Sequence, residues 1–500
     1  MQLNKLQVPN LKSKISALLL SLGLFLSGFA YGQEVSLDRL MGHIQTLCSS
    51  DYGGRLAGTQ KYMDAAEYVA TELKSYGIES YDEDWNQLFE VECNEVENCT
   101  FNTYVNANDV RTVYVLGRDF VCGSMTGRGY ADANVVFCGY GIDAAAFNEY
   151  ADVDARGKIV MVVSGVPSFL PSHITDSYTS LRDKARVAKD HGAVALVVVN
   201  RAENCRRNEV QSANYCGQGP HLATFPVVQP TFECGELLLE GEKQSIDSTL
   251  ALIAQTQKPQ SFHLLKKFEI DVNAKYHPRA VTANVVGVLK GFDRKMRDEI
   301  VIVGANLDHI GMQGKTCLFP GADDNASGVA ALLETAKLLA ESPMKPKRTF
   351  VFVVFSGAEV QHLGAQVFLS NFDKQHKVEA YIGAEHIGNG DSIVALGNNR
   401  FPALWEVANH NDTTSNIRML AHGIKANPKG NAGPFAAMGI PSLVFSTLNG
   451  NRYAHVPSDK PENINRTLLV QATQLMYQTL KELGDGDYRG RDRKTMKKRQ

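Results

Sequence analysis

The feature that most constrains the fold is a series of short, continuously apolar segments in the second half of the chain. Two of them, 299–306 (EIVIVGAN) and 348–355 (RTFVFVVF), lack the polar alternation of a half-exposed strand, which is typical of parallel strands buried on both faces. Between them, apolar residues keep helical spacing from a predicted N-cap, Asn325, to about Glu341. Further strands are predicted at 380–384 and 441–445, and a closing helix at 468–483. This alternation predicts an α/β fold, a mostly parallel sheet sandwiched by helices.

The first 275 residues have a different organisation. Residues 60–77 predict an amphipathic helix, and an aromatic, extended segment follows at 85–91. From residue 110 onward, short apolar strands alternate with turns, and one helix is predicted at 181–192. We therefore predict a β-rich domain at 110–275, inserted into an α/β domain that is formed by 33–109 and 276–484.

The two ends of the chain carry signals that are separate from the fold. Three lysines in the first 14 residues precede the apolar run 15–29 and a small-x-small site at 30–32. This is the pattern of a secretory signal peptide, 1–32, so we expect a secreted or periplasmic protein. No later segment is apolar for long enough to span a membrane. The basic segment 485–500 has no apolar pattern and is predicted to be a disordered tail.

Composition limits the partners and leaves the cysteines open. The net charge of −3 over 500 residues gives no reason to expect nucleic acid or an anionic membrane as a partner. Nine cysteines follow the signal peptide, and Cys93/Cys99 and Cys205/Cys216 are close enough in sequence to form disulfides in an oxidising compartment. Their connectivity and the oligomeric state are left open by the sequence. No CxxC pair is present, which argues against a cysteine zinc site.

Polar side chains that could carry chemistry follow several predicted strands. Asn306 and Asp308 lie at the end of the first strand and point to the same side of an extended chain. Each candidate alone has an ordinary alternative, such as a helix start, a solvated carboxylate or a structural histidine. Together, carboxylates and an imidazole at the ends of several strands predict a metal site at one edge of the sheet. The remaining candidates are Asp323, Asp324, Glu359, Glu385 and His455.

Five segments carry a resemblance to a known family. In their order along the chain they resemble the secreted zinc aminopeptidase family, whose relatives include bacterial leucyl aminopeptidases, glutamate carboxypeptidases, glutaminyl cyclases and the transferrin receptor ectodomain. The segment LCSSDYGGRLAGT (47–59) is similar to the opening of that family, and 128–231 resembles the protease-associated domain that many members carry as an insert. The five segments are GANLDHIG (304–311), FPGADDNASGVAALLETAKLL (319–339), FVFVVFSGAEVQHLG (350–364), AEHIG (384–388) and YAHVPSDK (453–460).

The resemblance implies one complete zinc site and a second zinc site that binds more weakly. Family members bind two zinc ions that share a bridging aspartate, and Asp324, Glu359 and His455 match the three ligands of the first ion. For the second ion this chain has Asn306 where the family has histidine, and Glu385 where it has aspartate. A neutral amide competes poorly with imidazole for zinc, so we expect one zinc ion and a second site that is weak or empty. Asp308 matches the aspartate that orients the missing imidazole.

The largest departure from the family lies beside a predicted ligand. Family members have a glutamate at the position of Ala358, and that glutamate takes a proton from the attacking water. Proton transfer of this kind contributes ~10²–10⁴-fold to the rate, and a methyl group cannot perform it. The resemblance therefore implies a metallopeptidase of the aminopeptidase class whose hydrolysis is absent or severely reduced. Two alternatives stay open: a non-catalytic member that binds a peptide or protein in the cleft, and a one-zinc enzyme with different chemistry.

Three further histidines lie close to these positions in the sequence. His309 follows Asp308, His362 follows Glu359, and His386 follows Glu385. Neighbouring residues on a strand point to opposite faces, so His386 is expected to face away from the metal. A structural role is the simpler interpretation for each of the three, although His362 could reach the cleft.

Overall fold

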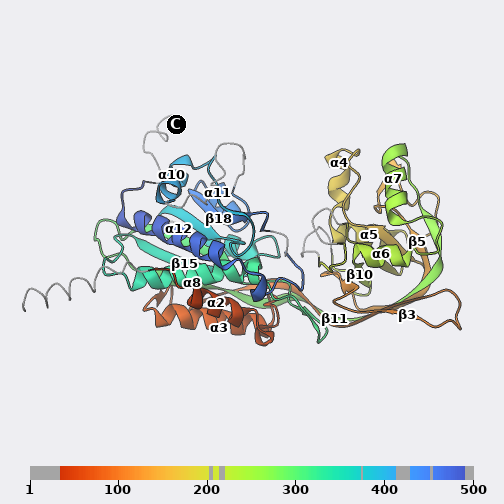
Figure 1. Cartoon of the computed structure of the whole chain (residues 1–500), viewed down its shortest axis with the longest axis horizontal. Helices are drawn as coiled ribbons and strands as arrows, with labels where there is room; N and C mark the ends of the chain where they lie inside the picture. The colour runs from red at the N-terminus through yellow and green to blue at the C-terminus, as the bar shows by residue number, and fades with distance from the viewer. Residues whose placement is uncertain are drawn as a thin grey trace, which may run out of the picture.

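The computed structural model describes residues 34–489 except 202–206, 213–219, 373–375, 413–427 and 451–453. The predicted signal peptide, Cys205, Cys216 and most of the basic tail lie outside these described residues. Figure 1 shows two lobes, joined by a long antiparallel ribbon of β2 (Asn86–Tyr104) and β11 (Phe262–Leu289). No helix among the described residues is long and apolar enough to cross a membrane.

The first lobe is built on the predicted parallel strands. β12 (Glu299–Asn306) lies between β15 (Thr349–Phe355) and β16 (Lys377–Ala384) and is parallel to both. β18 (Ser442–Leu448) pairs in parallel with β16, while β17 (Ser392–Leu396) and β11 pair antiparallel with β18 and β15. The carboxyl ends of four parallel strands therefore lie along one edge of the sheet, as the sequence predicts.

Helices cover both faces of this sheet. Successive residues of β12 point to opposite faces, so alternate residues pack against different helical layers. Val301 and Val303 pack in one apolar cluster with the first helical layer, and Ile300 and Ile302 pack in another with the second layer. The first layer comprises α2 (Leu37–Leu47), α3 (Gln60–Ser75), α8 (Ser327–Ala340), α10 (Pro402–Asn411) and α12 (Arg466–Asp485). The second comprises α9 (Leu363–Asn371) and α11 (Ala432–Ala437). The α/β sandwich is thus observed.

The second lobe continues the same sheet. Its strands follow β11 in the order β5 (Gly129–Phe137), β8 (Ile159–Val163), β9 (Ala195–Val199), β10 (Val227–Pro230) and β4 (Phe120–Cys122). Its helices are α4 (Ser172–Thr175), α5 (Leu181–Asp190), α6 (Phe232–Leu238) and α7 (Ile246–Thr256). Short strands complete the fold: β1 (Glu79–Ser80), β3 (Thr112–Tyr114), β6 (Asp143–Ala144), β7 (Phe147–Asn148), β13 (Met312–Gln313) and β14 (Cys317–Leu318). Because β2 and β11 run through both lobes, the predicted boundary at residue 276 falls inside a strand.

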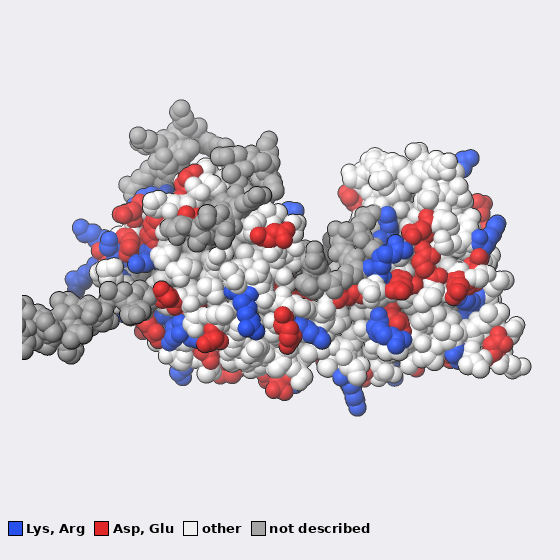
Figure 2. Space-filling model, in the orientation of Figure 1, with Lys and Arg blue, Asp and Glu red and all other residues white. Residues whose placement is uncertain are grey.

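Figure 2 shows the charged side chains on one face of the molecule. On this face Lys and Arg are interspersed with Asp and Glu over both lobes. The distribution matches the near-balanced sequence, with 51 basic and 54 acidic residues.

The structure corrects three details of the sequence analysis. Cys93 and Cys99 are free buried thiols; both lie on β2, and six residues of strand span roughly 20 Å, far beyond disulfide reach. Asn325 does not cap the following helix, whose N-cap is Ala326. Asp485 is the last residue of α12, and Tyr488 accepts a hydrogen bond from buried Arg348 at 2.5 Å. The ordered chain therefore extends beyond residue 484.

Candidate metal centre

The three residues matched to the first zinc ion meet at the carboxyl edge of the sheet. His455 Nε2 lies 3.3 Å from Asp324 Oδ2 and 3.3 Å from Glu359 Oε2. Asp324 comes from the π-helical turn η3 (Ala322–Ala326) before α8, and Glu359 from the segment after β15. All three residues are at most 9% exposed. Donor atoms on a tetrahedral zinc with ~2.0–2.2 Å bonds lie about 3.3–3.6 Å apart, so both spacings from His455 suit a zinc ion.

A fourth side chain, His309, joins this cluster. Its ligand atom and those of the other three residues all lie within 4.8 Å of one another. His309 Nδ1 is 3.7 Å from Asp324 Oδ2 and 3.9 Å from Glu359 Oε1, and the residue is fully buried. The sequence analysis favoured a structural role for His309. His309 comes close to the turn that carries Asp324 only after folding, so no local sequence pattern could have identified it.

The electrostatics of the cluster keep Asp324 and His309 in the forms that bind a metal. Burial alone would raise the pKa of Asp324, but the surrounding histidines lower it overall, so this carboxylate stays ionised. Burial lowers the pKa of His309 to about 3, so its ring is neutral. Burial would also lower the pKa of His455, but the Glu359 and Asp324 carboxylates raise it well above its usual value. A proton on His455 thus offsets the two carboxylates, as a metal ion would.

Two buried aspartates hold the segments that carry the carboxylate ligands. The Asp308 carboxylate accepts hydrogen bonds from the backbone N–H groups of Ala358 at 3.1 Å and Glu359 at 3.3 Å. The Asp459 carboxylate accepts from the N–H groups of Asp323 at 2.8 Å and Asp324 at 3.0 Å. Asp308 therefore has a role that needs no imidazole partner. Asp459 was missed by the sequence analysis, since its two partners are about 135 residues away in the chain.

The residues at the second family position do not form a comparable cluster. Asn306 Oδ1 accepts a hydrogen bond from Asn325 Nδ2 at 3.0 Å. Glu385 Oε1 accepts from the backbone N–H of Asn431 at 3.1 Å, and its Oε2 lies against Gly430. Among the described residues, the four-residue cluster is the only group found with metal-ligand spacing. Asn306 and Glu385 thus line the same cleft as Asp324, but both already accept hydrogen bonds from other residues.

His386 lies where the sequence analysis did not expect it. Its Nε2 is 3.6 Å from Asp324 Oδ1, the carboxylate oxygen that faces away from His455 and His309. The expectation that it faces away from the metal was wrong because strand geometry ends at Ala384 and His386 has a left-handed φ of 53°. Left-handed backbone is also found at His362 and His455. Such conformations cost about 1–3 kcal/mol each and cluster at functional sites.

A cleft of about 320 Å³ opens onto the cluster. Ala358 lies in its wall beside Glu359, and His362 also lines it, as the sequence analysis allowed. The second lobe reaches this wall: Gln211 Nε2 donates to Ala454 O at 3.0 Å, and the Ser212 N–H donates to His455 O at 3.1 Å. Those contacts were not foreseen, because nothing in the sequence places the insert against the metal loop. The other lining residues are Asn306, Asp324, Glu385, His386 and His455.

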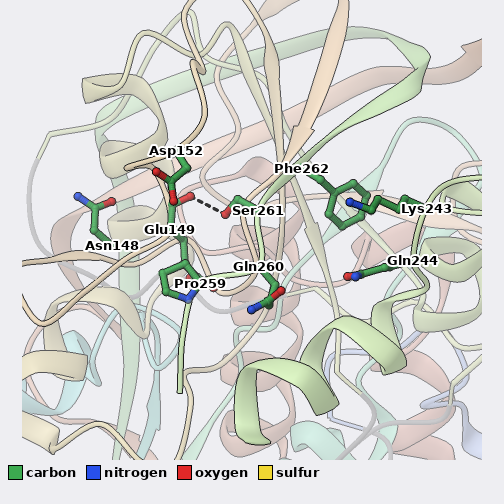
Figure 3. Close-up of a pocket in the computed structure, with 9 residues that line it drawn as sticks. All are labelled: Asn148, Glu149, Asp152, Lys243, Gln244, Pro259, Gln260, Ser261 and Phe262. Atoms are coloured by element: carbon green, nitrogen blue, oxygen red, sulfur yellow. Dashed lines mark hydrogen bonds between the residues drawn. The ribbon is translucent and has the colours of Figure 1, made fainter. Parts of the chain in front are cut away.

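A smaller cavity of about 130 Å³ lies in the second lobe, far in sequence from the metal residues (Figure 3). In it Ser261 Oγ donates to the backbone oxygen of Glu149 at 2.6 Å, and Lys243 and Phe262 lie on another wall. Glu149 Oε2 is bound by the N–H groups of Tyr140 and Ile142. The buried Glu149 carboxylate thus serves to hold a turn, and the cavity has no member of the metal cluster.

Comparison with known proteins supports this assignment of fold. Residues 284–480 match peptidase family M28, and residues 130–238 match the PA domain. The chain is 23% identical over 410 residues to the probable lipoprotein aminopeptidase LpqL of Mycobacterium tuberculosis. The aligned region covers 81% of this chain and 67% of that protein. It is also 23% identical over 345 residues to the aminopeptidase YwaD of Bacillus subtilis, covering 66% of this chain and 64% of that protein.

A solved structure extends the likeness to the whole fold. The zinc aminopeptidase BSAP from Bacillus subtilis superposes with a TM-score of 0.63 over 92% of this chain and 98% of that one, at 18% sequence identity. At this identity the likeness concerns the fold alone. The α/β domain of this chain is thus similar to peptidase family M28 over residues 284–480, and the domain inserted into it matches the PA domain over residues 130–238.

Proposed function

We propose that this protein is an exported M28-family protein that binds one zinc ion and a peptide in its cleft, with peptide hydrolysis absent or severely reduced. The single observation that carries the proposal is Ala358, whose methyl group lines the cleft beside the ligand Glu359. At this position the resembled aminopeptidases have the glutamate that accepts a proton from the attacking water. The chain therefore keeps residues that hold a metal and lacks the group that moves the proton.

The side chains support one ion more strongly than two. Asp324, Glu359 and His455 converge with spacings that suit zinc, and zinc is the metal of the aminopeptidases with this fold. When bound there, the ion would supply positive charge that offsets the Asp324 and Glu359 carboxylates. Asn306 and Glu385, which would serve a second ion, already accept hydrogen bonds from Asn325 and Asn431.

The cleft supports peptide binding. Its volume of about 320 Å³ suits a short peptide segment, and its wall combines the charged cluster with Gln211 of the PA domain. Export is supported by the predicted signal peptide, and the relative LpqL is itself named a lipoprotein.

The test begins with metal content and turnover. Protein dialysed against zinc is expected to retain one ion per chain by elemental analysis, and to release no product from a panel of aminoacyl chromogenic substrates. Turnover at ordinary enzyme rates of ~1–10³ s⁻¹ would refute the loss of hydrolysis. In that case His362→Ala would show whether His362, whose Nδ1 is buried without a hydrogen bond, supplies the base.

Binding is measured separately from turnover. Zinc-loaded protein is titrated calorimetrically with tripeptides that have either a free or an acetylated N-terminus. Binding of the free form alone supports a cleft that recognises peptide N-termini. Failure of both forms to bind would refute the peptide-binding part of the proposal.

A further inference from the structure

His309 is the one member of the cluster that no cleft wall includes. It is fully buried, while Asp324, Glu359 and His455 all line the cleft. A metal held by those three ligands would therefore have the solvent-filled cleft on one side and the His309 ring on the other. The question is whether that ring is a bystander or a ligand.

The His309 ring is fixed in place by its surroundings. Its backbone N–H donates to Arg55 O at 3.1 Å, and Leu56 forms a parallel β-bridge with it. The ring packs against Gly321, whose φ is +62°; a Cβ atom there would lie 2.7 Å from His309 Cδ2. The backbone of His309 is therefore held on both sides, and one edge of its ring packs closely against Gly321.

The polar atoms of this ring are unsatisfied. Within the described part of the chain, neither Nδ1 nor Nε2 of His309 makes a hydrogen bond, although both are buried. Buried polar atoms are nearly always paired, because an unpaired one costs about 1–3 kcal/mol. Nδ1 lies 3.7 Å and 3.9 Å from carboxylate oxygens of two predicted ligands. An ion between them would satisfy Nδ1 and both carboxylates together.

We infer that His309 is the fourth protein ligand of the metal, through Nδ1, so that the ion is held by two histidines, one aspartate and one glutamate. This inference rests on the proposed one-metal site. A zinc ion with four protein ligands is typical of structural sites, whereas catalytic sites keep a position open for water or substrate. The metal of this chain then fastens together the segments that follow β12 and β15, the η3 turn and the loop before α12.

The inference has a consequence for attempts to restore activity. If three ligands bound the ion, replacing Ala358 by glutamate would return the missing proton acceptor next to an open position. With His309 bound as well, Ala358→Glu alone leaves no open position and no turnover. Loss of hydrolysis then has two independent causes in this chain, one in the cleft and one behind the metal.

The test uses Co²⁺, whose visible absorption depends on coordination number. Wild-type protein loaded with Co²⁺ is expected to show a four-coordinate spectrum that does not change when azide is added. In His309→Ala an exchangeable position is opened, so azide should shift the spectrum. Its metal affinity should fall by more than ~100-fold, since removing a group that merely orients a ligand already costs 10–100-fold. The control is His43→Ala, which removes another buried imidazole of the same lobe, hydrogen-bonded to Tyr68 at 2.6 Å, and should change neither property.

The outcomes separate this inference from the proposed function. A wild-type cobalt spectrum that responds to azide as the His309→Ala spectrum does would overturn the inference and leave the one-metal proposal intact. Wild-type protein that binds neither Co²⁺ nor Zn²⁺ would refute both. Should His309→Ala fail to fold, X-ray absorption fine structure of the zinc-loaded wild type decides: two imidazole ligands support the inference, and one overturns it.

Discussion

Removal of the Asp459 carboxylate tests what holds the aspartate loop in place. Asp459 is fully buried, and its two oxygens accept hydrogen bonds from the N–H groups of Asp323 at 2.8 Å and Asp324 at 3.0 Å. In Asp459→Ala these two donors lose their partner in a dry environment. A buried unpaired donor costs about 1–3 kcal/mol, so the two together cost roughly 2–6 kcal/mol.

Part of this cost is offset. Burial, together with the neighbouring Asp323 carboxylate, raises the pKa of Asp459 to about 7. Removing one of these crowded carboxylates relieves that repulsion. The expected loss in the free energy of unfolding is therefore in the lower half of this range, at about 2–4 kcal/mol. Asp459→Asn keeps one acceptor oxygen but turns an amide group toward the other N–H. It should therefore lose about half as much.

The assay can be confined to the first lobe. The chain has two tryptophans, Trp85 and Trp405, and both pack with the apolar core of the α/β domain. Urea unfolding of metal-free protein, followed by tryptophan fluorescence, therefore reports on this domain. The matched control is Glu462→Ala, an exposed carboxylate three residues from Asp459, which should change the free energy of unfolding by less than ~0.5 kcal/mol.

The comparison of variants decides the matter. The order of stability should be wild type, Asp459→Asn, then Asp459→Ala, with the zinc affinity falling in the same order. If Asp459→Ala is as stable as Glu462→Ala, the carboxylate does not hold the loop and the reasoning from its two hydrogen bonds is wrong.

Three further predictions concern other parts of the molecule. Burial raises the pKa of Glu149 to about 7, above the 4.5 of a free glutamate. The PA domain should therefore lose up to ~3 kcal/mol of stability as the pH rises from about 4.5 to 7. Glu149→Gln should abolish this pH dependence in urea titrations followed by circular dichroism, and an unchanged dependence would contradict the prediction. Arg55 is buried and donates four hydrogen bonds to backbone carbonyl groups; Arg55→Met should cost at least ~3 kcal/mol by tryptophan-detected unfolding, and a loss below ~1 kcal/mol would refute that role. Asn306→His alone should still bind one zinc ion, because His386 lies against the Asp324 oxygen that a second ion would need. Asn306→His/His386→Ala should bind two ions by elemental analysis. Two ions in the single variant would show that His386 does not block the second site.

The parts of this fold that could be predicted are those with local causes. β12 and β15 are continuous in apolar residues because both faces of the sheet are covered, and that pattern is visible in any short window of sequence. Asp324, Glu359 and His455 were named because motif resemblance fixes positions along the chain. The roles of Asp459 and His309 depend on segments that meet only after folding. No local pattern marks a carboxylate whose donors are about 135 residues away.

The position of His386 shows how a local rule fails. Alternation along a strand predicts that His386 and Glu385 face opposite sides, and the rule holds only while the backbone remains extended. β16 ends at Ala384, and Asn325 Oδ1 accepts a hydrogen bond from the His386 N–H at 3.0 Å. At His386 the backbone is left-handed, and the ring lies 3.6 Å from Asp324 Oδ1. Asn325, which was expected to cap a helix, thus contacts the residue whose direction was mispredicted.

Under the proposed function, the charges around the site give a physical reason for metal binding to persist without proton transfer. Five buried carboxylates lie in or directly behind the cluster: Asp308, Asp323, Asp324, Glu359 and Asp459. Burial raises the pKa of Asp308 and Asp459 to about 7 and that of Asp323 to about 6, which measures how poorly the site tolerates its own negative charge. Under the proposed function, Ala358 lacks only the group that would move a proton. The buried carboxylates around it are still present, so the physical reason for binding a cation would persist without catalysis.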